Sequence, residues 1–320
     1  MNYYFAPLEG MTGYRYRNIH NRHFPGMDRY YSPFVVTRDG GIMKDKELQD
    51  ILPENNEGIC LVPQILTNIA ENFLQASGQM AELGYQEVNL NLGCPSGTVT
   101  GKGRGAGFLR LERRNGLQNF LDEIYAHAEI EISIKTRIGW DDPEDFSDLL
   151  QLFNEYPIRE LIIHPRTRQE FYKGGVHRDV FAFAYEHSQN PICYNGDLKN
   201  ATDVRKLVQE YSDLQSVMIG RGLIADPALV SRLQGNVVTK EQIRNFYQDL
   251  FHTYQQWLSG DTPLLHKMKE LWIFMAESFT NSEPYLKKIK KTSRLVEYQG
   301  IVDRLFEEQE LVWAGENVGI

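Results

Sequence analysis

The chain has 320 residues, of which 42% are hydrophobic and 24% are charged, the composition of an ordinary globular protein. This length suits a barrel of roughly 250 residues with a smaller appended domain. No stretch approaches the roughly 20 consecutive apolar residues that a membrane-spanning helix needs. The net charge of −9 argues against a protein that coats nucleic acid over its whole surface, so any contact with RNA is expected to be local.

The first residues and the cysteines bear on compartment and on metal binding. Residues 1–7 lack the basic region and apolar core of a signal peptide, which predicts a cytoplasmic protein. Cys60, Cys94 and Cys193 form no CxxC pair and no Cys/His cluster, so neither a disulfide framework nor a metal site is expected. Cys60 and Cys193 lie inside strand-like runs and are predicted to be small buried side chains.

Eight short apolar runs with strand character follow one another along the first 220 residues. They span 3–6, 29–33, 59–64, 87–92, 131–136, 160–164, 191–195 and 216–220. Segments with helical spacing of apolar residues separate several of them, at 70–83, 116–128, 146–155 and 201–211. This alternation predicts parallel strands joined by crossover helices, and the strand number favours a closed (β/α)₈ barrel over an open α/β sheet.

The strand signals stop after about Val238. Beyond it, apolar residues fall at helical spacing through 246–257, 266–279 and 285–296. We therefore predict a barrel domain over 1–235 and an all-helical domain over 240–320. Gly235 interrupts the pattern at the join, and Thr239, followed by Glu241, can cap the next helix.

Cys94 follows the fourth predicted strand, in Asn91-Leu92-Gly93-Cys94-Pro95, and precedes a glycine-rich loop at 101–107. Catalytic residues of such barrels come from the carboxyl ends of the strands, and a Gly-Cys-Pro sequence just past a strand is a poor place for core packing. A free thiol is mostly protonated near neutral pH, so Cys94 is a candidate acid or, if activated, a nucleophile. The glycine-rich loop is not a Walker loop and is expected to cover the site or to contact substrate.

Polar residues also end the later strands. Lys135 and His164 end the fifth and sixth strands and are expected to face the barrel mouth. The last two strands finish in Asn195-Gly196-Asp197 and Gly220-Arg221-Gly222. Barrels commonly bind phosphate there through backbone N–H groups, and Arg221 adds a planar double donor, so a phosphate site is predicted.

Taken together, these motifs resemble the tRNA-dihydrouridine synthases, FMN enzymes with a (β/α)₈ barrel and a C-terminal helical domain. The resemblance spans the barrel and rests on the segments 6–12, 91–95 with the glycine-rich loop, 135–140, 164–168, 195–197 and 218–222, and on Gln64. It implies that NADPH, or NADH, reduces the flavin, that a hydride passes to carbon 6 of a uracil in tRNA, and that Cys94 protonates carbon 5.

The resemblance also implies the cofactor contacts. Pro7, Leu8 and Glu9 would line the flavin, Gln64 and Lys135 would contact its ring system, and His164 would bond near the ring or the ribityl chain. Asn195, Gly196, Asp197, Gly220 and Arg221 would hold the ribityl and phosphate end. Leu8, Gly13 and Pro165 depart from the residues usual in the family, without removing a reactive group.

For the RNA, the resemblance implies tRNA as the partner of a monomer that needs neither membrane nor metal. The expected RNA contacts are Lys102, Arg104, Arg166, Arg168, Lys287, Lys288 and Lys291. The segment 261–294 supports this, because it carries seven basic residues against four acidic ones, a net charge of +3 in an acidic protein.

Three alternatives remain open at this point. A flavin barrel of the dihydroorotate or dihydropyrimidine dehydrogenase type would act on a free pyrimidine, but it gives no reason for a basic helical domain. An RNA-binding or RNA-folding protein could retain the barrel with little redox role, although Cys94, Lys135 and His164 speak against this. A dihydrouridine synthase could also act on ribosomal RNA, because the sequence does not identify the docking partner.

Overall fold

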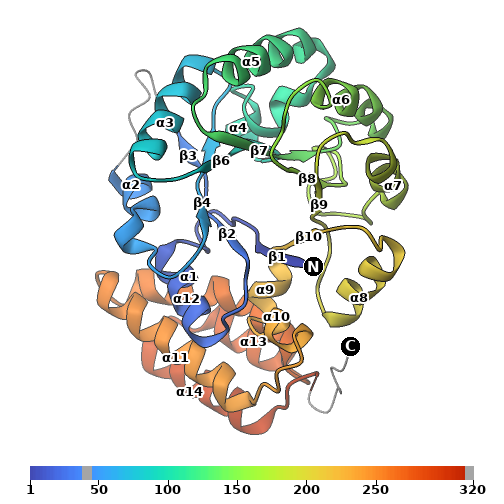
Figure 1. Ribbon diagram of the computed structural model, residues 1–320. Helices are drawn as coiled ribbons and strands as arrows, with labels where there is room; N and C mark the ends of the chain where they lie inside the picture. Colours follow the sequence, from blue (N-terminus) through green and yellow to red (C-terminus); the bar gives the residue numbers. More distant parts are fainter. Residues whose placement is uncertain (38–44, 314–320) are drawn as a thin grey trace. The chain divides into compact units, whose positions relative to one another are not determined.

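The computed structural model describes residues 1–37 and 45–313. Within them, ten strands form one sheet in the order β3-β5-β6-β7-β8-β9-β10-β1-β2-β4 (Figure 1). The strands are β1 (Asn2–Phe5), β2 (Arg29–Tyr31), β3 (Val35–Val36), β4 (Leu61–Val62), β5 (Gln64–Leu66), β6 (Glu87–Leu92), β7 (Glu131–Arg137), β8 (Leu161–His164), β9 (Ile192–Tyr194) and β10 (Ser216–Ile219).

The sheet closes on itself through one short stretch of chain. β4 pairs in parallel with β2, and β5, which begins two residues after β4 ends, pairs in parallel with β6. Pro63 separates the two pieces, because a proline has no N–H to donate to a ladder. β4, one end of the ten-strand order, is therefore next in sequence to β5, the second strand from the other end, and the sheet is a TIM barrel, as predicted.

Helices connect the strands and then continue alone to the end of the described chain. They are α1 (Tyr14–His23), α2 (Asp45–Ile51), α3 (Ala70–Glu82), α4 (Gly97–Thr100), α5 (Arg114–His127), α6 (Phe146–Phe153), α7 (Arg178–His187), α8 (Ala201–Glu210), α9 (Arg221–Ala225), α10 (Leu229–Leu233), α11 (Lys240–Trp257), α12 (Asp261–Met275), α13 (Glu283–Lys291) and α14 (Leu295–Glu308). Among the described residues, no helix is long and apolar enough to cross a membrane.

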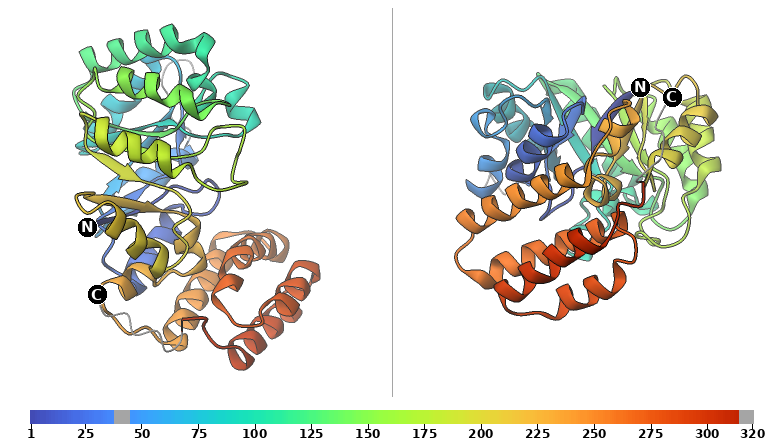
Figure 2. Two further views of the ribbon diagram at one scale, coloured as in Figure 1. Left: turned by 90° about the vertical axis from the view of Figure 1, so that its right-hand side faces the viewer. Right: turned by 90° about the horizontal axis from the view of Figure 1, so that it is seen from below.

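By internal contacts, the chain divides into two compact units. The first contains residues 1–14, 28–196 and 212–218, and thus nearly all of the sheet. The second contains 15–27, 197–211 and 219–320, and in it α11 to α14 pack against one another (Figures 1 and 2). The predicted domain limits of 1–235 and 240–320 remain a prediction.

The sequence pattern located most of these elements. β6 has the predicted limits, and the other long strands and α3, α5, α6 and α8 lie within a few residues of theirs. α11 and α12 begin earlier than predicted, by six and five residues before 246 and 266. Thr239 caps α11 as expected, but its capping-box partner is Gln242, three residues on, because that side chain reaches back to the backbone N–H of the cap.

Two expectations were wrong. The helix predicted over 285–296 is broken, because Thr292 accepts a hydrogen bond from the Arg294 N–H and donates one to Glu297, so α13 ends and α14 begins there. Cys60 is exposed rather than buried, because β4 starts only at Leu61. Cys193 is fully buried, as predicted.

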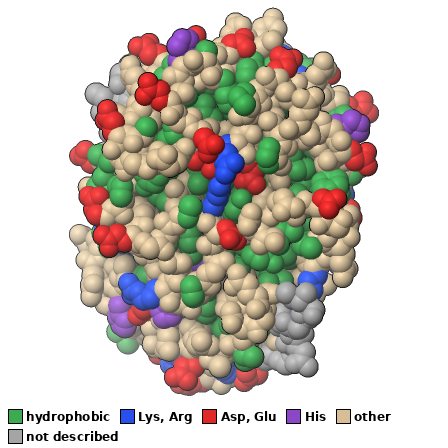
Figure 3. All heavy atoms as spheres, in the orientation of Figure 1, with side chains coloured by type: hydrophobic (Ala, Val, Ile, Leu, Met, Phe, Trp, Pro, Cys, Tyr) green, Lys and Arg blue, Asp and Glu red, His purple; other side chains and the backbone are tan. Residues whose placement is uncertain are grey.

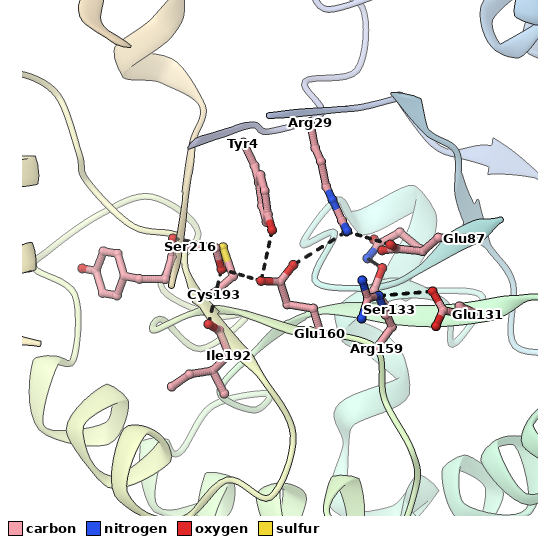
Figure 4. Close-up of polar contacts among 12 residues, drawn as sticks. Tyr4, Arg29, Glu87, Glu131, Ser133, Arg159, Glu160, Ile192, Cys193 and Ser216 are labelled. Atoms are coloured by element: carbon pink, nitrogen blue, oxygen red, sulfur yellow. Dashed lines mark hydrogen bonds and ion pairs between the residues drawn. The ribbon is translucent and has the colours of Figure 1, made fainter. Parts of the chain in front are cut away.

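At the amino ends of the strands, the barrel interior is closed by a polar cluster (Figure 4). Arg29 Nη1 lies 2.7 Å from Glu87 Oε2 and 4.0 Å from Glu160 Oε2. Glu160 also accepts hydrogen bonds from the Ser216 and Tyr4 hydroxyls. Burial raises the pKa of Glu160 above its ordinary value, and the nearby Arg29 opposes that shift.

Candidate active site

The carboxyl ends of the strands surround a pocket of about 390 Å³ within the first unit. Its lining residues are Pro7, Leu8, Glu9, Met11, Pro33, Phe34, Gln64, Asn91, Gly93, Cys94, Pro95, Ser96, Lys135, Arg137, His164, Phe171 and Tyr172. The volume lies in the range of small-molecule and cofactor sites, and the lining mixes apolar walls with a few convergent polar groups, as such sites do. The structure thus brings Pro7 to Glu9, Gln64, Cys94, Lys135 and His164 to one pocket.

Lys135 supplies the pocket with an amine that is only partly in contact with water. It is the fifth residue of β7, and burial, followed by the charge of Arg137, lowers its pKa to about 8. Over residues 1–37 and 45–313, the structure gives its amine no hydrogen bond and no ion pair. A half-buried cation without an acceptor is unfavourable unless a ligand supplies one.

Cys94 lies in a loop whose backbone is fixed by one side chain. The Asn91 Oδ1 accepts hydrogen bonds from the backbone N–H groups of Gly93, at 3.0 Å, and Cys94, at 2.9 Å. Burial is the main cause that raises the pKa of the Cys94 thiol, and the charge of Glu9 adds to it. The thiol is therefore protonated at neutral pH, which suits a proton donor better than a nucleophile.

A chain of amide side chains connects this loop to the barrel interior. Asn91 Nδ2 donates to Gln64 Oε1, and Gln64 Nε2 donates to Asn89 Oδ1, both at 2.7 Å. Asn89 Nδ2 in turn donates to Ser133 Oγ at 2.9 Å. Because all of these side chains are buried, their amide orientations are fixed by one another.

Arg137, whose role the sequence did not indicate, holds three backbone carbonyls at the mouth. Its guanidinium donates to the carbonyl oxygens of Gly93, at 3.0 Å, Thr167, at 2.8 Å, and Phe171, at 2.7 Å. These bonds join the cysteine loop to the loop after β8. That loop puts Phe171, which has a φ of 53°, and Tyr172 into the pocket wall.

His164 lies at the end of β8, with its ring 5.9 Å from that of Tyr172. The Arg166 Nη1 lies 3.2 Å from His164 Nε2. Since a guanidinium can only donate, Nε2 of a bonded imidazole carries no proton, and Nδ1 is then the protonated nitrogen of the neutral ring.

A family comparison identifies the chain at this point. A model described as dihydrouridine synthase (Dus) matches residues 4–313. The chain belongs to the dihydrouridine synthase family. Its curated relatives include tRNA-dihydrouridine synthase B of Shewanella oneidensis, 27% identical over 240 residues, which are 74% of this chain and 72% of the relative. Another is tRNA-dihydrouridine synthase B of Pasteurella multocida, 26% identical over 241 residues, 75% of this chain and 70% of the relative.

Solved structures resemble this chain in fold alone. The old yellow enzyme homologue from Zymomonas mobilis has a TM-score of 0.54 at 11% identity, over 75% of this chain and 91% of that one. Morphinone reductase has a TM-score of 0.53 at 12% identity, over 77% and 88% of the two chains. Both matches cover at least three quarters of this chain and agree with the predicted fold class.

The residues predicted for the phosphate end do not line this pocket. Asn195 Nδ2 donates to the Met218 carbonyl oxygen, at 2.8 Å, within the first unit. In the second unit, Arg221 Nη2 lies 2.9 Å from Asp197 Oδ1, and Asp197 has a φ of 44°. Gly222 is required by packing, since a Cβ there would lie 2.2 Å from the Leu198 carbonyl oxygen.

The residues predicted to contact RNA differ in exposure. Lys102 and the lysines of α13 at 287, 288 and 291 are exposed, and Arg104 and Arg168 are partly exposed. Arg166, by contrast, is only 1% exposed and donates to the Gly174 carbonyl oxygen at 2.7 Å. Its burial is a correction to the surface position expected of an RNA contact, because the residue fastens the loop after β8.

Proposed function

We propose that this chain is an FMN-dependent tRNA-dihydrouridine synthase, which reduces the C5–C6 double bond of uridines in tRNA with NADPH or NADH. The single observation that carries the proposal is the meeting of Cys94, Lys135, His164 and Gln64 in one pocket of a chain of this family. The cytoplasm is the compartment that we propose, as the sequence suggested.

The residues of the pocket fit a flavin. Its apolar wall, at Pro7, Leu8, Pro33 and Phe34, suits the faces of a flat ring system. Lys135 offers an ammonium group that has no acceptor in the described chain, and a flavin ring presents oxygen and nitrogen acceptors. A flavin bound there would supply the hydride for carbon 6 of the uracil.

Each residue then has a separate task. Lys135 and Gln64 would hold the ring system, and His164 would donate through Nδ1 near the ring or the ribityl chain. Asn195 to Asp197 and Gly220-Arg221, which follow the last two strands, are our proposal for the ribityl and phosphate end. Arg221→Ala should weaken FMN retention, measured by dialysis, and unchanged retention would place the phosphate elsewhere.

Cys94 would donate the proton to carbon 5. Hydride addition to carbon 6 leaves negative charge on an enolate, which needs an acid near carbon 5. The raised pKa of the Cys94 thiol keeps the proton on sulfur until that moment. Asn91, through its bonds to the Gly93 and Cys94 N–H groups, holds the sulfur-bearing loop in place.

For the RNA we propose contacts from Lys102, Arg104 and Arg168 on the barrel and from Lys287, Lys288 and Lys291 on α13. The last turn of α13 carries Lys288, Lys290 and Lys291. Lys287 forms an ion pair with Glu283, with its Nζ 2.8 Å from Oε1. Such lysines supply the local positive charge that RNA phosphates require. The acting species in this proposal is a monomer.

The test is to map dihydrouridine in total RNA from cells with and without this protein. The proposal expects dihydrouridine to disappear from defined tRNA positions and to return when the chain is restored. Loss from ribosomal RNA with unchanged tRNA would contradict the tRNA assignment. Unchanged RNA, together with turnover of a free pyrimidine, would contradict the RNA substrate altogether.

A further inference from the structure

The loop after β8 is long, and its two ends are joined. It spans residues 165–177, between β8 and α7 (Figure 1). The N–H of its last residue, His177, donates to the carbonyl oxygen of its first, Pro165, at 2.8 Å. Loops of this length without regular structure of their own are uncommon in compact domains, and the ordered ones are usually functional.

Two aromatic residues in the middle of this loop form part of the pocket wall. Phe171 and Tyr172 line the pocket, and they are 38% and 53% exposed. Two large apolar side chains exposed next to each other at the edge of a pocket suit a surface that a ligand covers. Such a wall can hold a ligand only if the loop keeps both rings in place.

The backbone of Phe171 needs support from its surroundings. Its φ of 53° lies in the left-handed region, which is costly for a residue with a Cβ and persists only where surrounding contacts enforce it. Its N–H donates to the Arg168 carbonyl oxygen, at 3.2 Å, and its own carbonyl oxygen accepts from Arg137, at 2.7 Å. Further support comes from the residue just before it, Glu170.

Glu170 joins the beginning of the loop to its end through both carboxylate oxygens. Its Oε2 accepts hydrogen bonds from the Thr167 N–H, at 2.7 Å, and from the Thr167 hydroxyl, at 3.1 Å. Its Oε1 lies 2.8 Å from Nε2 of His177. Although burial opposes it, the bonds from His177 and Thr167 lower the pKa of Glu170, so the carboxylate is ionised at neutral pH.

The charge of Glu170 argues for an internal role. It is the one acidic residue of a loop that also contains Arg166, Arg168 and Lys173. A carboxylate repels RNA phosphates, so Glu170 does not add to RNA binding by direct contact. Its three hydrogen bonds also distinguish it from an exposed ion pair, which contributes little.

We propose that Glu170 is a positioning residue, which holds Phe171 and Tyr172 in the pocket wall by joining Thr167 to His177. The inference rests on the proposed function, since the uridine of the RNA is the ligand that would meet this wall. Loss of Glu170 is therefore expected to weaken the binding of the RNA substrate.

The flavin should be affected less than the RNA. Gln64, Lys135 and His164, the side chains proposed to hold its ring system and ribityl chain, belong to β5, β7 and β8 and not to the loop. Disorder in the loop leaves these strands in place. Flavin affinity and tRNA affinity therefore provide separate readouts.

The experiment compares Glu170→Ala with the conservative variant Glu170→Gln at about pH 8, where an ordinary imidazole is neutral. In Glu170→Gln the amide oxygen can accept from Thr167 while the amide N–H donates to His177, because a neutral imidazole can change tautomer. This variant should therefore retain the wall. Glu123→Ala is the matched control, because it breaks another Glu–His pair, in α5, where His127 Nδ1 lies 3.5 Å from Glu123 Oε1.

Hydrogen exchange measures the order of the loop without reference to activity. Glu170→Ala should speed exchange in the peptide that covers residues 166–178 by about 10-fold, because the amide of Thr167 loses its acceptor and the loop its cross-connection. Exchange in β6 and β7 should not change. Glu170→Gln and Glu123→Ala should match wild type in the same peptide.

Steady-state kinetics of the holoenzyme then connect the loop to the substrate. Glu170→Ala should raise the KM for tRNA about 3- to 10-fold, because the wall that receives the uridine is less ordered. Its kcat and its FMN affinity should stay near the wild-type values. Glu170→Gln should restore the wild-type KM, which a role of the negative charge itself would not allow.

The outcomes separate this inference from the proposed function. If wild type forms dihydrouridine in tRNA while Glu170→Ala keeps the wild-type exchange or the wild-type KM, the positioning role is wrong and the function stands. Faster exchange that extends to β6 and β7, or equal effects in Glu123→Ala, would also overturn it, because the effect would then not be local. A Glu170→Gln as impaired as Glu170→Ala would contradict the hydrogen-bonding role. A wild type that forms no dihydrouridine in any RNA would overturn the proposed function, and with it the substrate of the wall.

Discussion

The two ends of the barrel interior contain similar chemical groups in opposite states of pairing. At the amino ends of the strands, Arg29 is placed between Glu87 and Glu160, and Glu160 is further bonded to two hydroxyls. At the carboxyl ends, Lys135 has no acceptor in the described chain and Cys94 lines a pocket of about 390 Å³. The charged groups of the first end are paired with one another, although Glu87 Oε1 and Glu160 Oε2 accept no hydrogen bond, whereas Lys135 at the second end has no partner in the described chain.

The surface at the amino end also has its opposite charges side by side. Over the ring of strands, the face shown in Figure 3 has Lys and Arg side chains bordered by Asp and Glu, so opposite charges offset one another. Arg159 and Glu131, both about half exposed, form an ion pair beside the amino-end cluster (Figure 4). Buried charged side chains are present at both ends of the barrel, so burial and charge do not identify the functional end. The missing partner of Lys135 in the described chain does.

The largest expected effect is on the rate of reduction, and it comes from a change at the pocket. Cys94→Ala should lower the rate of tRNA reduction about 10²- to 10⁴-fold, the range for loss of a general acid, with flavin content unchanged. Single-turnover reduction of tRNA by the pre-reduced enzyme measures it. Cys60→Ala, which removes an exposed cysteine, should behave as wild type. Full activity of Cys94→Ala would defeat the assignment.

The next largest effect is at the opposite end and concerns stability. Glu160→Ala should lower the free energy of unfolding by about 3 kcal/mol, because it removes one of the two carboxylates beside Arg29 and the acceptor of the Tyr4 hydroxyl, and leaves the Ser216 hydroxyl only the Ile192 carbonyl oxygen at 3.4 Å. Urea denaturation measures it, with activity per folded molecule as the second readout. A normal stability, or a loss of specific activity as large as that of Cys94→Ala, would remove the distinction between the two ends.

A smaller effect of opposite sign is expected for Lys135→Met. In flavin-free protein it should raise the free energy of unfolding by about 1 kcal/mol, because it removes a desolvated cation that has no partner. The pKa of Lys135 in the folded state is about 8, below its ordinary value near 10.4, so the cost of the charge is complete below pH 8. The advantage of the variant should therefore shrink as the pH rises from 8 to 10.4, and a constant or growing advantage would contradict this reasoning.

The smallest effect is a shift in a pH profile. Because burial raises the pKa of Cys94, the thiol should still donate its proton at a pH where an ordinary cysteine, with a pKa near 8.5, is half ionised. The single-turnover rate should therefore fall only at a more alkaline pH. A decline centred below 8.5 would show that the thiol is not protected by burial, or that another group limits the step.

The sequence predicted the positions that depend on regular structure. Lys135 and His164 were found because each lies at or near the carboxyl end of a strand, and Cys94 because Gly-Cys-Pro directly follows one. Gln64, which begins β5, was found only through the family resemblance. Strand periodicity and the parallel connection are enough to bring such ends together. The same reasoning located β6 with its limits.

The parts that the sequence did not predict depend on contacts between loops. Phe171 and Tyr172 reach the pocket because the Arg137 guanidinium donates hydrogen bonds to the Thr167 and Phe171 carbonyl oxygens. No local sequence pattern predicts those bonds. Arg166 was expected on the surface for the same reason: an arginine in a loop is usually exposed, and only the folded loop shows its bond to Gly174. Trp140, with the guanidinium groups of Arg110 and Arg168 over its ring, is a third such case.

The most direct test of the contrast between the two ends is the binding of FMN itself. Flavin-free wild type, Lys135→Met and Glu160→Gln are each titrated with FMN, and the quenching of flavin fluorescence gives affinity and stoichiometry. We predict one FMN per chain for wild type and for Glu160→Gln, and a large loss of affinity for Lys135→Met. Undiminished binding in Lys135→Met, or a wild type that takes up no flavin, would contradict the placement of the cofactor at the mouth.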